Sequence, residues 1–246
     1  MKFAVISDIH GNIVALRAVL AEIERERVDH LLVLGDLFSS GHVQDILTEL
    51  RGRDAVIIRG NNEDYQLEQN LSDWEGHDQF EELAATRRDI TPQDMQWIAA
   101  LPAQVTLTYP DVSLRLMHIE APADETITLC GHTHRNPFVR EENGRYICNT
   151  GSVGENFDPA FTADVTFITC QGSNITFEQR RVPYDFEAWR HMTGSTLKQR
   201  LNLRAAELGR NLFMEFLAEA DHGLGWPIPN DIWRATAKQW QERGLL

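Results

Sequence analysis

Five short polar motifs, each standing where an apolar run ends, constrain this chain more than any other feature. They are Ser7-Asp8-Ile9-His10-Gly11-Asn12, Gly35-Asp36, Gly60-Asn61-Asn62-Glu63, His118 and Gly131-His132-Thr133-His134. Short apolar runs with such boundaries are typical of buried strands. In open α/β sheets, ligands gather at the carboxyl ends of the strands, so these residues are expected to converge although they are far apart in sequence.

The first sixty residues alternate between strand-like and helix-like patterns. We expect strands at 2–7, 30–34 and 55–59 and helices at 13–27 and 43–50. Asn12 is a plausible N-cap of the first helix, because a side-chain amide oxygen can accept from the first free backbone N–H groups. This alternation predicts βαβ units and a mostly parallel sheet.

The remainder of the chain has a different organisation. Residues 63–100 are polar and helical and read as an insertion over or beside the site, with Thr91-Pro92-Gln93-Asp94 as a helix start. Residues 105–109 and 113–117 are predicted to form a hairpin, and Asn143-Gly144 is a strong hairpin turn signal. Further strands are expected at 126–129, 137–140, 145–149, 165–169 and 175–181.

The chain is predicted to be helical from Asp185 onward. We expect a first domain at 1–194 and a helical appendage at 195–246 that packs on the body. Trp226, Trp233 and Trp240 follow one another at intervals of seven residues in this tail. They could pack onto the body or form an oligomer contact, such as a homodimer through the C-terminal helices.

Composition narrows the class of protein. The chain has 246 residues and a formal net charge of -14, which argues against nucleic acid or an anionic membrane as partner. Cys130, Cys148 and Cys170 form no Cys-x-x-Cys pair, and we expect them to be small buried residues. The first strand leaves no room for a signal peptide, and no apolar stretch approaches the ~20 residues needed to span a bilayer. A cytoplasmic enzyme is therefore expected.

The motif side chains form a metal-ligand set. Carboxylate and amide oxygens mixed with imidazoles suit Mn, Fe or Zn better than Ca. One aspartate can bridge two ions, and two ions roughly 3.5–4 Å apart can clamp both oxygens of a phosphoryl displacement. Alone, an aspartate such as Asp36 is usually a turn or cap residue and a histidine such as His118 is usually structural, but the joint pattern favours ligands. The histidines outside the pattern are interpreted as structural, with His42 close enough to Asp36 to reconsider: His30, His42, His77, His191 and His222.

The motifs resemble those of the calcineurin-like metallophosphoesterase superfamily, D-x-H, G-D, G-N-x-[DE], H and G-H-x-H. The resemblance covers roughly Met1 to Pro183, including Asn149-Thr150-Gly151-Ser152. Within that superfamily the chain is similar to small bacterial phosphodiesterases and to asymmetrical diadenosine tetraphosphate hydrolases. The resemblance implies an α/β fold, a four-layer αββα sandwich.

The resemblance also implies a role for each motif residue. Asp8, His10 and His134 would hold one metal, Asn61, His118 and His132 the other, and Asp36 would bridge them. Asn12 and Asn149 would lie near the phosphate, and a metal-bridging hydroxide would attack phosphorus. We expect two divalent ions, manganese first, with Fe, Zn, Ni or Mg as alternatives.

The chain departs from the family pattern at two positions. His118 is followed by Ile119-Glu120, where the family often has glycine. Asn62 stands where many members have a histidine that protonates the leaving group or orients the phosphate, and an amide cannot transfer a proton. This favours substrates with good leaving groups, such as phosphoanhydrides or activated aryl diesters. Alternatively, Asn62 only shapes the loop and binds substrate while another acid, Glu63 or Asp64, serves.

The leading interpretation is a metal-dependent hydrolase of phosphodiester or phosphoanhydride bonds in nucleotide-like small molecules, with diadenosine tetraphosphate as a candidate. A broad phosphodiesterase or a protein phosphatase is the alternative within the enzymes. A non-catalytic scaffold of the same fold, as in the retromer complex, is the alternative of another class. All seven expected ligands are present in this chain, which argues against the scaffold.

Overall fold

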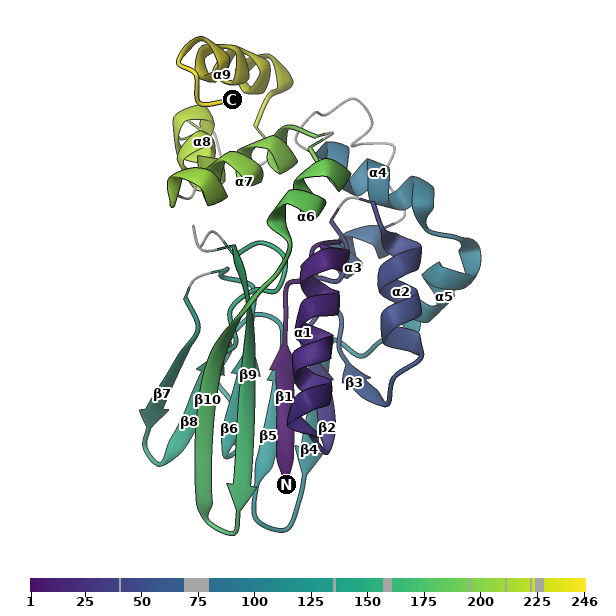
Figure 1. Cartoon of the computed structure of the whole chain (residues 1–246), viewed down its shortest axis with the longest axis vertical. Helices are drawn as coiled ribbons and strands as arrows, with labels where there is room; N and C mark the ends of the chain where they lie inside the picture. Colours follow the sequence, from purple (N-terminus) through teal and green to yellow (C-terminus); the bar gives the residue numbers. More distant parts are fainter. Residues whose placement is uncertain are drawn as a thin grey trace.

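The computed structural model places two five-stranded sheets face to face (Figure 1). It describes residues 1–39, 41–68, 80–134, 136–156, 161–194, 196–210, 212–221, 223 and 228–246. His77, Trp226 and His222, named above, lie outside the described residues.

The first sheet contains the strands that carry the N-terminal motifs. Its strands are β1 Lys2–Ile6, β2 His30–Val33, β3 Ala55–Ile57, β9 Thr162–Gln171 and β10 Asn174–Pro183. Their order is β10-β9-β1-β2-β3, with β1, β2 and β3 parallel and β9 and β10 antiparallel. The parallel βαβ start was predicted correctly, although β3 ends two residues earlier than expected.

The second sheet has the order β4-β5-β6-β8-β7. Its strands are β4 Gln104–Thr108, β5 Ser113–Met117, β6 Ile127–Cys130, β7 Phe138–Glu142 and β8 Arg145–Asn149. The two predicted hairpins are confirmed as antiparallel pairs, and Asn143 and Gly144 have the positive φ angles, 54° and 76°, of a tight hairpin turn. The expectation of a mostly parallel sheet was wrong, because short hairpin links make both sheets mixed.

Successive residues of β1 point to opposite faces of the sheet, so this strand contributes to two hydrophobic cores. Ala4 and Ile6 pack in the core between the first sheet and its helices, together with Leu16. Phe3 and Val5 pack in the core between the two sheets. The near-continuous apolar run of β1 follows from this burial on both faces.

Most described helices lie beside the first sheet or beyond the motif end of the sandwich (Figure 1). The helices are α1 Ile13–Glu26, α2 Val43–Arg51, α3 Asn61–Leu67, α4 Glu81–Asp89, α5 Pro92–Ala100, α6 Phe186–Met192, α7 Leu197–Leu208, α8 Leu212–Asp221 and α9 Asn230–Glu242. Asn12 caps α1 by accepting from Ala15 N, as predicted, and Thr91 and Asp94 form a capping box at α5. The α/β class and the two-sheet architecture are confirmed. Among the described helices, none is long and apolar enough to cross a membrane.

The tail helices α7, α8 and α9 share a hydrophobic cluster of their own. Trp233 and Trp240 are buried in it, and Phe216 contacts both rings edge to face. Among the described residues, these two tryptophans pack within the tail, which corrects the expectation that they pack onto the body. A homodimer through the C-terminal helices stays a prediction. The division into domains at residue 194 stays a prediction.

Candidate metal centre

The loops that follow β1 and β2 run side by side. Asp8 N donates to Gly35 O at 3.0 Å, and His10 N donates to Asp36 O at 3.0 Å. This backbone pairing continues the parallel register of β1 and β2 beyond the strands. It fixes the side chains of Asp8, His10 and Asp36 next to one another at the carboxyl edge of the sheet.

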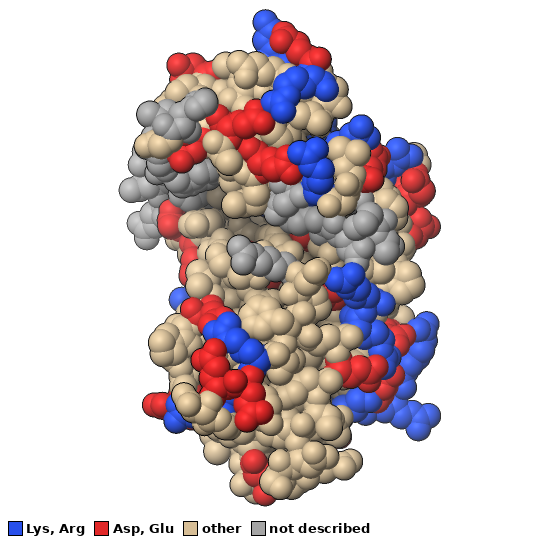
Figure 2. Space-filling model, turned by 90° about the vertical axis from the view of Figure 1, so that its left-hand side faces the viewer, with Lys and Arg blue, Asp and Glu red and all other residues tan. Residues whose placement is uncertain are grey.

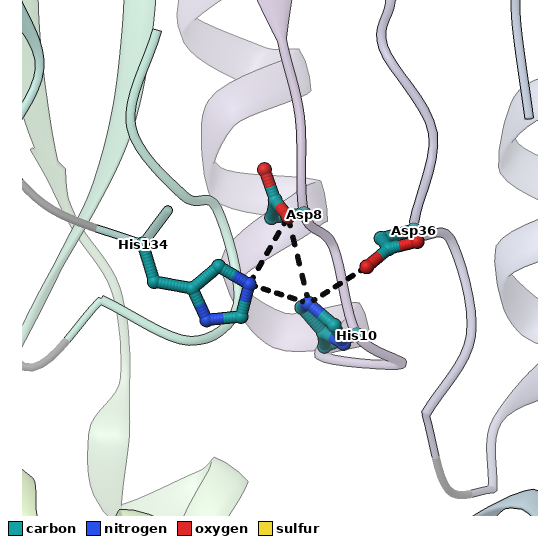
Figure 3. A group of neighbouring side chains, drawn as sticks. All are labelled: Asp8, His10, Asp36 and His134. Carbon is teal, nitrogen blue, oxygen red and sulfur yellow. Dashed lines mark hydrogen bonds and ion pairs between the residues drawn. The ribbon is translucent and has the colours of Figure 1, made fainter. Parts of the chain in front are cut away.

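A first cluster consists of Asp8, His10, Asp36 and His134 (Figure 3). His134 Nε2 lies 3.1 Å from Asp8 Oδ1 and 2.9 Å from His10 Nε2. His10 Nε2 lies 3.7 Å from Asp8 Oδ1 and 3.6 Å from Asp36 Oδ2. One atom from each of the four side chains lies within 4.8 Å of all the others, so one cation could be held among them.

A second cluster consists of Asp36, His118 and His132. His118 Nε2 lies 3.3 Å from Asp36 Oδ2 and 3.1 Å from Asn61 Oδ1. Asn61 begins α3 after a three-residue link from β3, and His118 follows β5. The structure therefore brings all seven predicted ligands to one edge, and Asp36 belongs to both clusters.

Hydrogen bonds on the outer ring nitrogens fix the direction in which two imidazoles face the site. His118 Nδ1 lies 2.8 Å from Leu34 O, and His134 Nδ1 lies 3.1 Å from Glu155 Oε2. Since a carbonyl or a carboxylate only accepts, each Nδ1 carries the proton in the neutral ring and each Nε2 offers a lone pair. Ligating histidines are oriented in this way in metal sites.

The pKa of each of the two site carboxylates, Asp8 and Asp36, is lowered. Burial raises the pKa of Asp8, but the imidazoles of His134, His10 and His118 outweigh it and hold the pKa well below its usual range. Burial likewise raises the pKa of Asp36, and His118 and His10 reverse the shift. Conversely, the carboxylates raise the pKa of His118 to about 9 against its own burial. Two buried carboxylates and the nearby imidazole nitrogens, once those nitrogens are deprotonated, form a donor set that fits a divalent cation.

Five of the seven candidate ligands have backbone conformations that residues other than glycine rarely adopt. Asp8, His10, Asp36, His132 and His134 have φ angles of 56°, 47°, 51°, 68° and 51°. Such left-handed residues, outside glycine, cluster at functional sites when the surrounding structure enforces them. The strained backbone independently marks the same positions as the motif pattern.

Glycine is required where the motif loops touch. A Cβ on Gly60 would lie 2.2 Å from Asp36 Oδ1, and a Cβ on Gly131 would lie 2.0 Å from Ser7 Oγ. Both distances are far below van der Waals contact. The glycines of the G-N and G-H-x-H motifs therefore permit the close approach that brings the ligands together.

The three predicted substrate-binding asparagines lie in different surroundings. Asn62 Nδ2 donates to Asp36 Oδ2 at 2.9 Å and lies 3.3 Å from His10 Nδ1, so it belongs to the site. Asn12 is buried and caps α1. Asn149 is buried and donates to Gly131 O at 2.8 Å. This hydrogen bond holds the loop that carries His132 and His134. Contact of these residues with phosphate stays a prediction.

The side chain of Glu63 joins the two motif loops that contain Asp36 and Gly60. Its carboxylate accepts from the backbone N–H groups of Asp36, Leu37 and Gly60, each at 2.8 Å, and is fully buried. Burial and the nearby Asp36 raise its pKa to about 7. Because both oxygens already bind backbone N–H groups, this geometry argues against Glu63 as the acid for a leaving group. Asp64 pairs instead with Arg59.

The sequence interpretation missed Glu155. This residue is 7% exposed, and its oxygens face His134 Nδ1 at 3.1 Å and His10 Nδ1 at 3.7 Å. Its position three residues after Ser152, beyond the last motif, carried no metal-ligand spacing that could have signalled it. The histidines outside the pattern have other contacts: His30 stacks on Phe3, and His42 lies 3.3 Å from Asp45.

Two face-to-face mixed sheets with a carboxylate and histidine cluster at the ends of β1 and β2 define a metallophosphoesterase. The chain belongs to the calcineurin-like phosphoesterase superfamily, whose domain profile matches residues 1–171. Family membership and the candidate metal-binding residues support phosphoester hydrolysis.

The chain is also similar to individual proteins. The chain is 25% identical over 222 residues to the uncharacterized protein MJ0912 of Methanocaldococcus jannaschii, covering 75% of this chain and 88% of that protein. A metallophosphoesterase from Sphaerobacter thermophilus superposes with a TM-score of 0.62 at 21% identity, covering 84% of this chain and 100% of that one. The hypothetical protein PH1004 from Pyrococcus horikoshii gives 0.64 at 16% identity, covering 78% and 91%. The two structures show the shared fold.

Proposed function

We propose that this protein is a dinuclear metal-dependent hydrolase of phosphodiester or phosphoanhydride bonds in nucleotide-like small molecules. The observation that carries the proposal is the position of Asp36 in both ligand clusters. A shared carboxylate would hold two cations side by side, with Asp8, His10 and His134 on one and Asn61, His118 and His132 on the other. Two divalent ions there would polarise the phosphoryl oxygens and lower the pKa of an attacking water.

The residues around the cations orient this arrangement. Asn62 donates from its backbone N–H to Asp36 Oδ1 at 2.9 Å and from its side chain to Asp36 Oδ2 at 2.9 Å. Both carboxylate oxygens of Asp36 are therefore held in one orientation by one residue. The mixed oxygen and imidazole donors favour manganese, iron or zinc over calcium.

The proposed preference for substrates with good leaving groups follows from Asn62, because its amide side chain cannot transfer a proton. An alkoxide leaving group is expelled with difficulty without an acid, since oxygens of the water type have a pKa near 15.7. A phosphate leaving group has a second pKa of about 6 and needs little protonation. Phosphoanhydrides such as diadenosine tetraphosphate are therefore the proposed substrates.

Side chains of the insertion, of α6 and of the tail line a cavity beside His10. Glu82 of α4, Trp189 of α6 and Asn202 of α7 contribute to its walls. These helices lie beside the site, and we propose that they restrict access to small molecules rather than a folded phosphoprotein. On the face drawn in Figure 2, acidic and basic side chains are interspersed. The proposal that nucleic acid is not a partner rests on the net charge of -14.

The test is a substrate panel on manganese-loaded protein, with diadenosine tetraphosphate, bis-nitrophenyl phosphate, cyclic AMP and a phosphopeptide. We expect the anhydride to be turned over fastest, and Asp36→Asn to abolish activity while the fold is retained. Equal rates on the anhydride and an alkyl diester would contradict the leaving-group argument. Protein that binds no transition metal and stays inactive with manganese would favour the non-catalytic scaffold instead.

A further inference from the structure

Glu155 is fixed relative to the loop that carries Asp8. Gly154 N donates to Asp8 O at 2.9 Å, and Glu155 N donates to Ser152 Oγ at 2.9 Å. Ser152 Oγ itself donates to Asp8 O at 2.9 Å. The carboxylate of Glu155 is thereby held behind the first ligand cluster.

From this position Glu155 contacts two candidate ligands at once. One oxygen lies 3.1 Å from His134 Nδ1 and the other lies 3.7 Å from His10 Nδ1. A carboxylate accepts hydrogen bonds, so Glu155 keeps the ring proton of His134 on Nδ1 and leaves its Nε2 free to bind a cation. Its other oxygen faces His10 Nδ1 from beyond hydrogen-bond distance. The two Nε2 atoms lie only 2.9 Å apart and converge on Asp8 (Figure 3).

A lysine from the tail contacts the same carboxylate. Lys198 of α7 places Nζ 2.9 Å from Glu155 Oε1 and 3.3 Å from Glu82 Oε2. Asn202, one helical turn later, donates to Glu155 Oε1 at 3.1 Å. Lys198 and Asn202 lie beyond residues 1–171, the part of the chain that the superfamily profile matches.

Electrostatics explains why this lysine matters. Glu155 is a further buried carboxylate beside the first ligand cluster, and an unpaired buried charge is strongly unfavourable. Glu82 fixes Lys198 from the other side, because it accepts from Ser39 Oγ at 3.1 Å and from Thr196 Oγ1 at 3.0 Å. Lys198 of the tail, Glu82 of the insertion and Glu155 of the loop between β8 and β9 therefore form one ion-pair network.

We propose that Lys198, acting through Glu155, holds His134 in the orientation that binds a divalent cation together with His10, so that tail helix α7 is part of the metal centre. Lys198 and Glu155 are positioning residues. The inference rests on the proposed function, since it assumes that His10 and His134 bind metal.

The experiment titrates full-length, metal-stripped protein with manganese by calorimetry and by metal-dependent thermal shift. We expect Lys198→Met and Glu155→Gln each to weaken manganese affinity about 10- to 100-fold, the usual loss for outer-shell partners of a metal site. Lys198→Arg should restore most of the affinity. Arg204→Met is the matched control, because it removes a positive charge from the same helix where Arg204 pairs with Glu207.

The double variant Lys198→Met/Glu155→Gln should bind no more weakly than Glu155→Gln alone, because the lysine acts through the glutamate. Unchanged affinity in Lys198→Met, or additive losses in the double variant, would overturn the inference. If Lys198→Met does not fold by circular dichroism, Asn202→Ala and Lys198→Arg provide the comparison. Failure of the wild-type protein to bind manganese would contradict the proposed function instead, so the two failures are distinguishable.

Discussion

The left-handed backbone at His132 has a consequence for stability that can be measured apart from catalysis. A residue other than glycine with φ near 68° is destabilised by on the order of 1 kcal/mol or more, which glycine avoids. The side chain of His132 is exposed, so little packing is lost on truncation. We therefore expect metal-free His132→Gly to be more stable than His132→Ala by about 1 kcal/mol in urea unfolding.

Both His132 variants should lose affinity for the second manganese ion, because both remove the same imidazole. A matching pair at Asn143, Asn143→Gly and Asn143→Ala, should show the same order of stability without any change in metal binding, since that turn residue lies in the β7–β8 hairpin. Equal stability of the two His132 variants would show that the structure imposes no strain at this position.

Asn62 provides a second prediction at the residue scale. Asn62→His would place a titrating group beside Asp36 Oδ2, which Asn62 Nδ2 now contacts at 2.9 Å. General acid catalysis contributes about 10²–10⁴-fold when the acid is well placed. We expect the ratio of alkyl diester to anhydride turnover to rise at least about tenfold. Steady-state kinetics on the two substrates measures it, with Asn62→Ala as the control in which the ratio should not rise.

At the scale of the secondary-structure elements, Asp94 joins α5 to α2. Its carboxylate accepts from Thr91 N at 3.0 Å, from Gln44 Nε2 at 2.7 Å and from Arg51 Nη1 at 2.8 Å. Burial raises the pKa of Asp94, but the hydrogen bonds from Thr91, Gln44 and Arg51 outweigh it and hold the pKa well below its usual range. Asp94→Asn should therefore reduce the free energy of unfolding by about 1–3 kcal/mol at neutral pH.

The pH dependence of that loss has a definite sign. A carboxyl with a lowered folded pKa contributes stability that is present above its ordinary pKa, 3.8, and is lost as the pH falls through the folded value. The difference in melting temperature between wild type and Asp94→Asn should thus be constant from pH 7 to about 5 and shrink below about 4. A difference that is independent of pH would refute the role of the charge. Asp111→Asn, in the exposed β4–β5 loop, is the control.

The reactivity of the three buried cysteines measures whether the sheets enclose them. Burial raises the pKa of the Cys130 and Cys148 thiols to about 12, and burial also raises that of Cys170. Because the thiolate is the reactive species, the native protein at pH 8 should react with Ellman's reagent about 10³-fold more slowly than the unfolded chain. Three thiols should become reactive in denaturant. Fast labelling of Cys130 or Cys148 in the native state would show that the sheets do not enclose them.

Sequence patterns predicted helix starts and hairpin turns correctly where residues close in sequence form them. Asn12 accepts from Ala15 N, Thr91 and Asp94 form a capping box, and Asn143-Gly144 makes a hairpin turn, all from side chains within a few residues. Sheet order was not predictable in the same way. Antiparallel pairing of β1 with β9 joins residues more than 160 positions apart, and no local spacing encodes it.

The same distinction applies to the site across the whole molecule. The clustering of the candidate ligands could be predicted because strand ends converge and because imidazole and carboxylate side chains at strand ends are recognisable in the sequence. Glu155 and Lys198 could not, because their importance arises from a 2.9 Å contact between a loop and a tail helix. A glutamate and a lysine in isolation are typical of solvated surface.

The tail itself gives the last prediction. Trp240 is fully buried, stacks edge to face on Phe216 with ring centroids 5.4 Å apart, and donates to Glu219 Oε2 at 2.9 Å. These contacts lie inside the tail's own cluster, separate from the two cores of the sandwich. Trp240→Ala should destabilise the tail by about 3–5 kcal/mol. The control is Leu208→Ala, whose side chain is 41% exposed on α7.

If the tail is a separate unit, Trp240→Ala should lose helical circular dichroism at a temperature where Cys130 and Cys148 still resist Ellman's reagent. Lys198 lies on α7, so its contact with Glu155 should be lost with the tail, and manganese affinity should fall by the same factor as in Lys198→Met. Coincident loss of helicity and thiol protection would instead mean that body and tail unfold together. In that case the tail's contacts with Glu82 and Glu155 would couple it to the body strongly enough to make one cooperative unit.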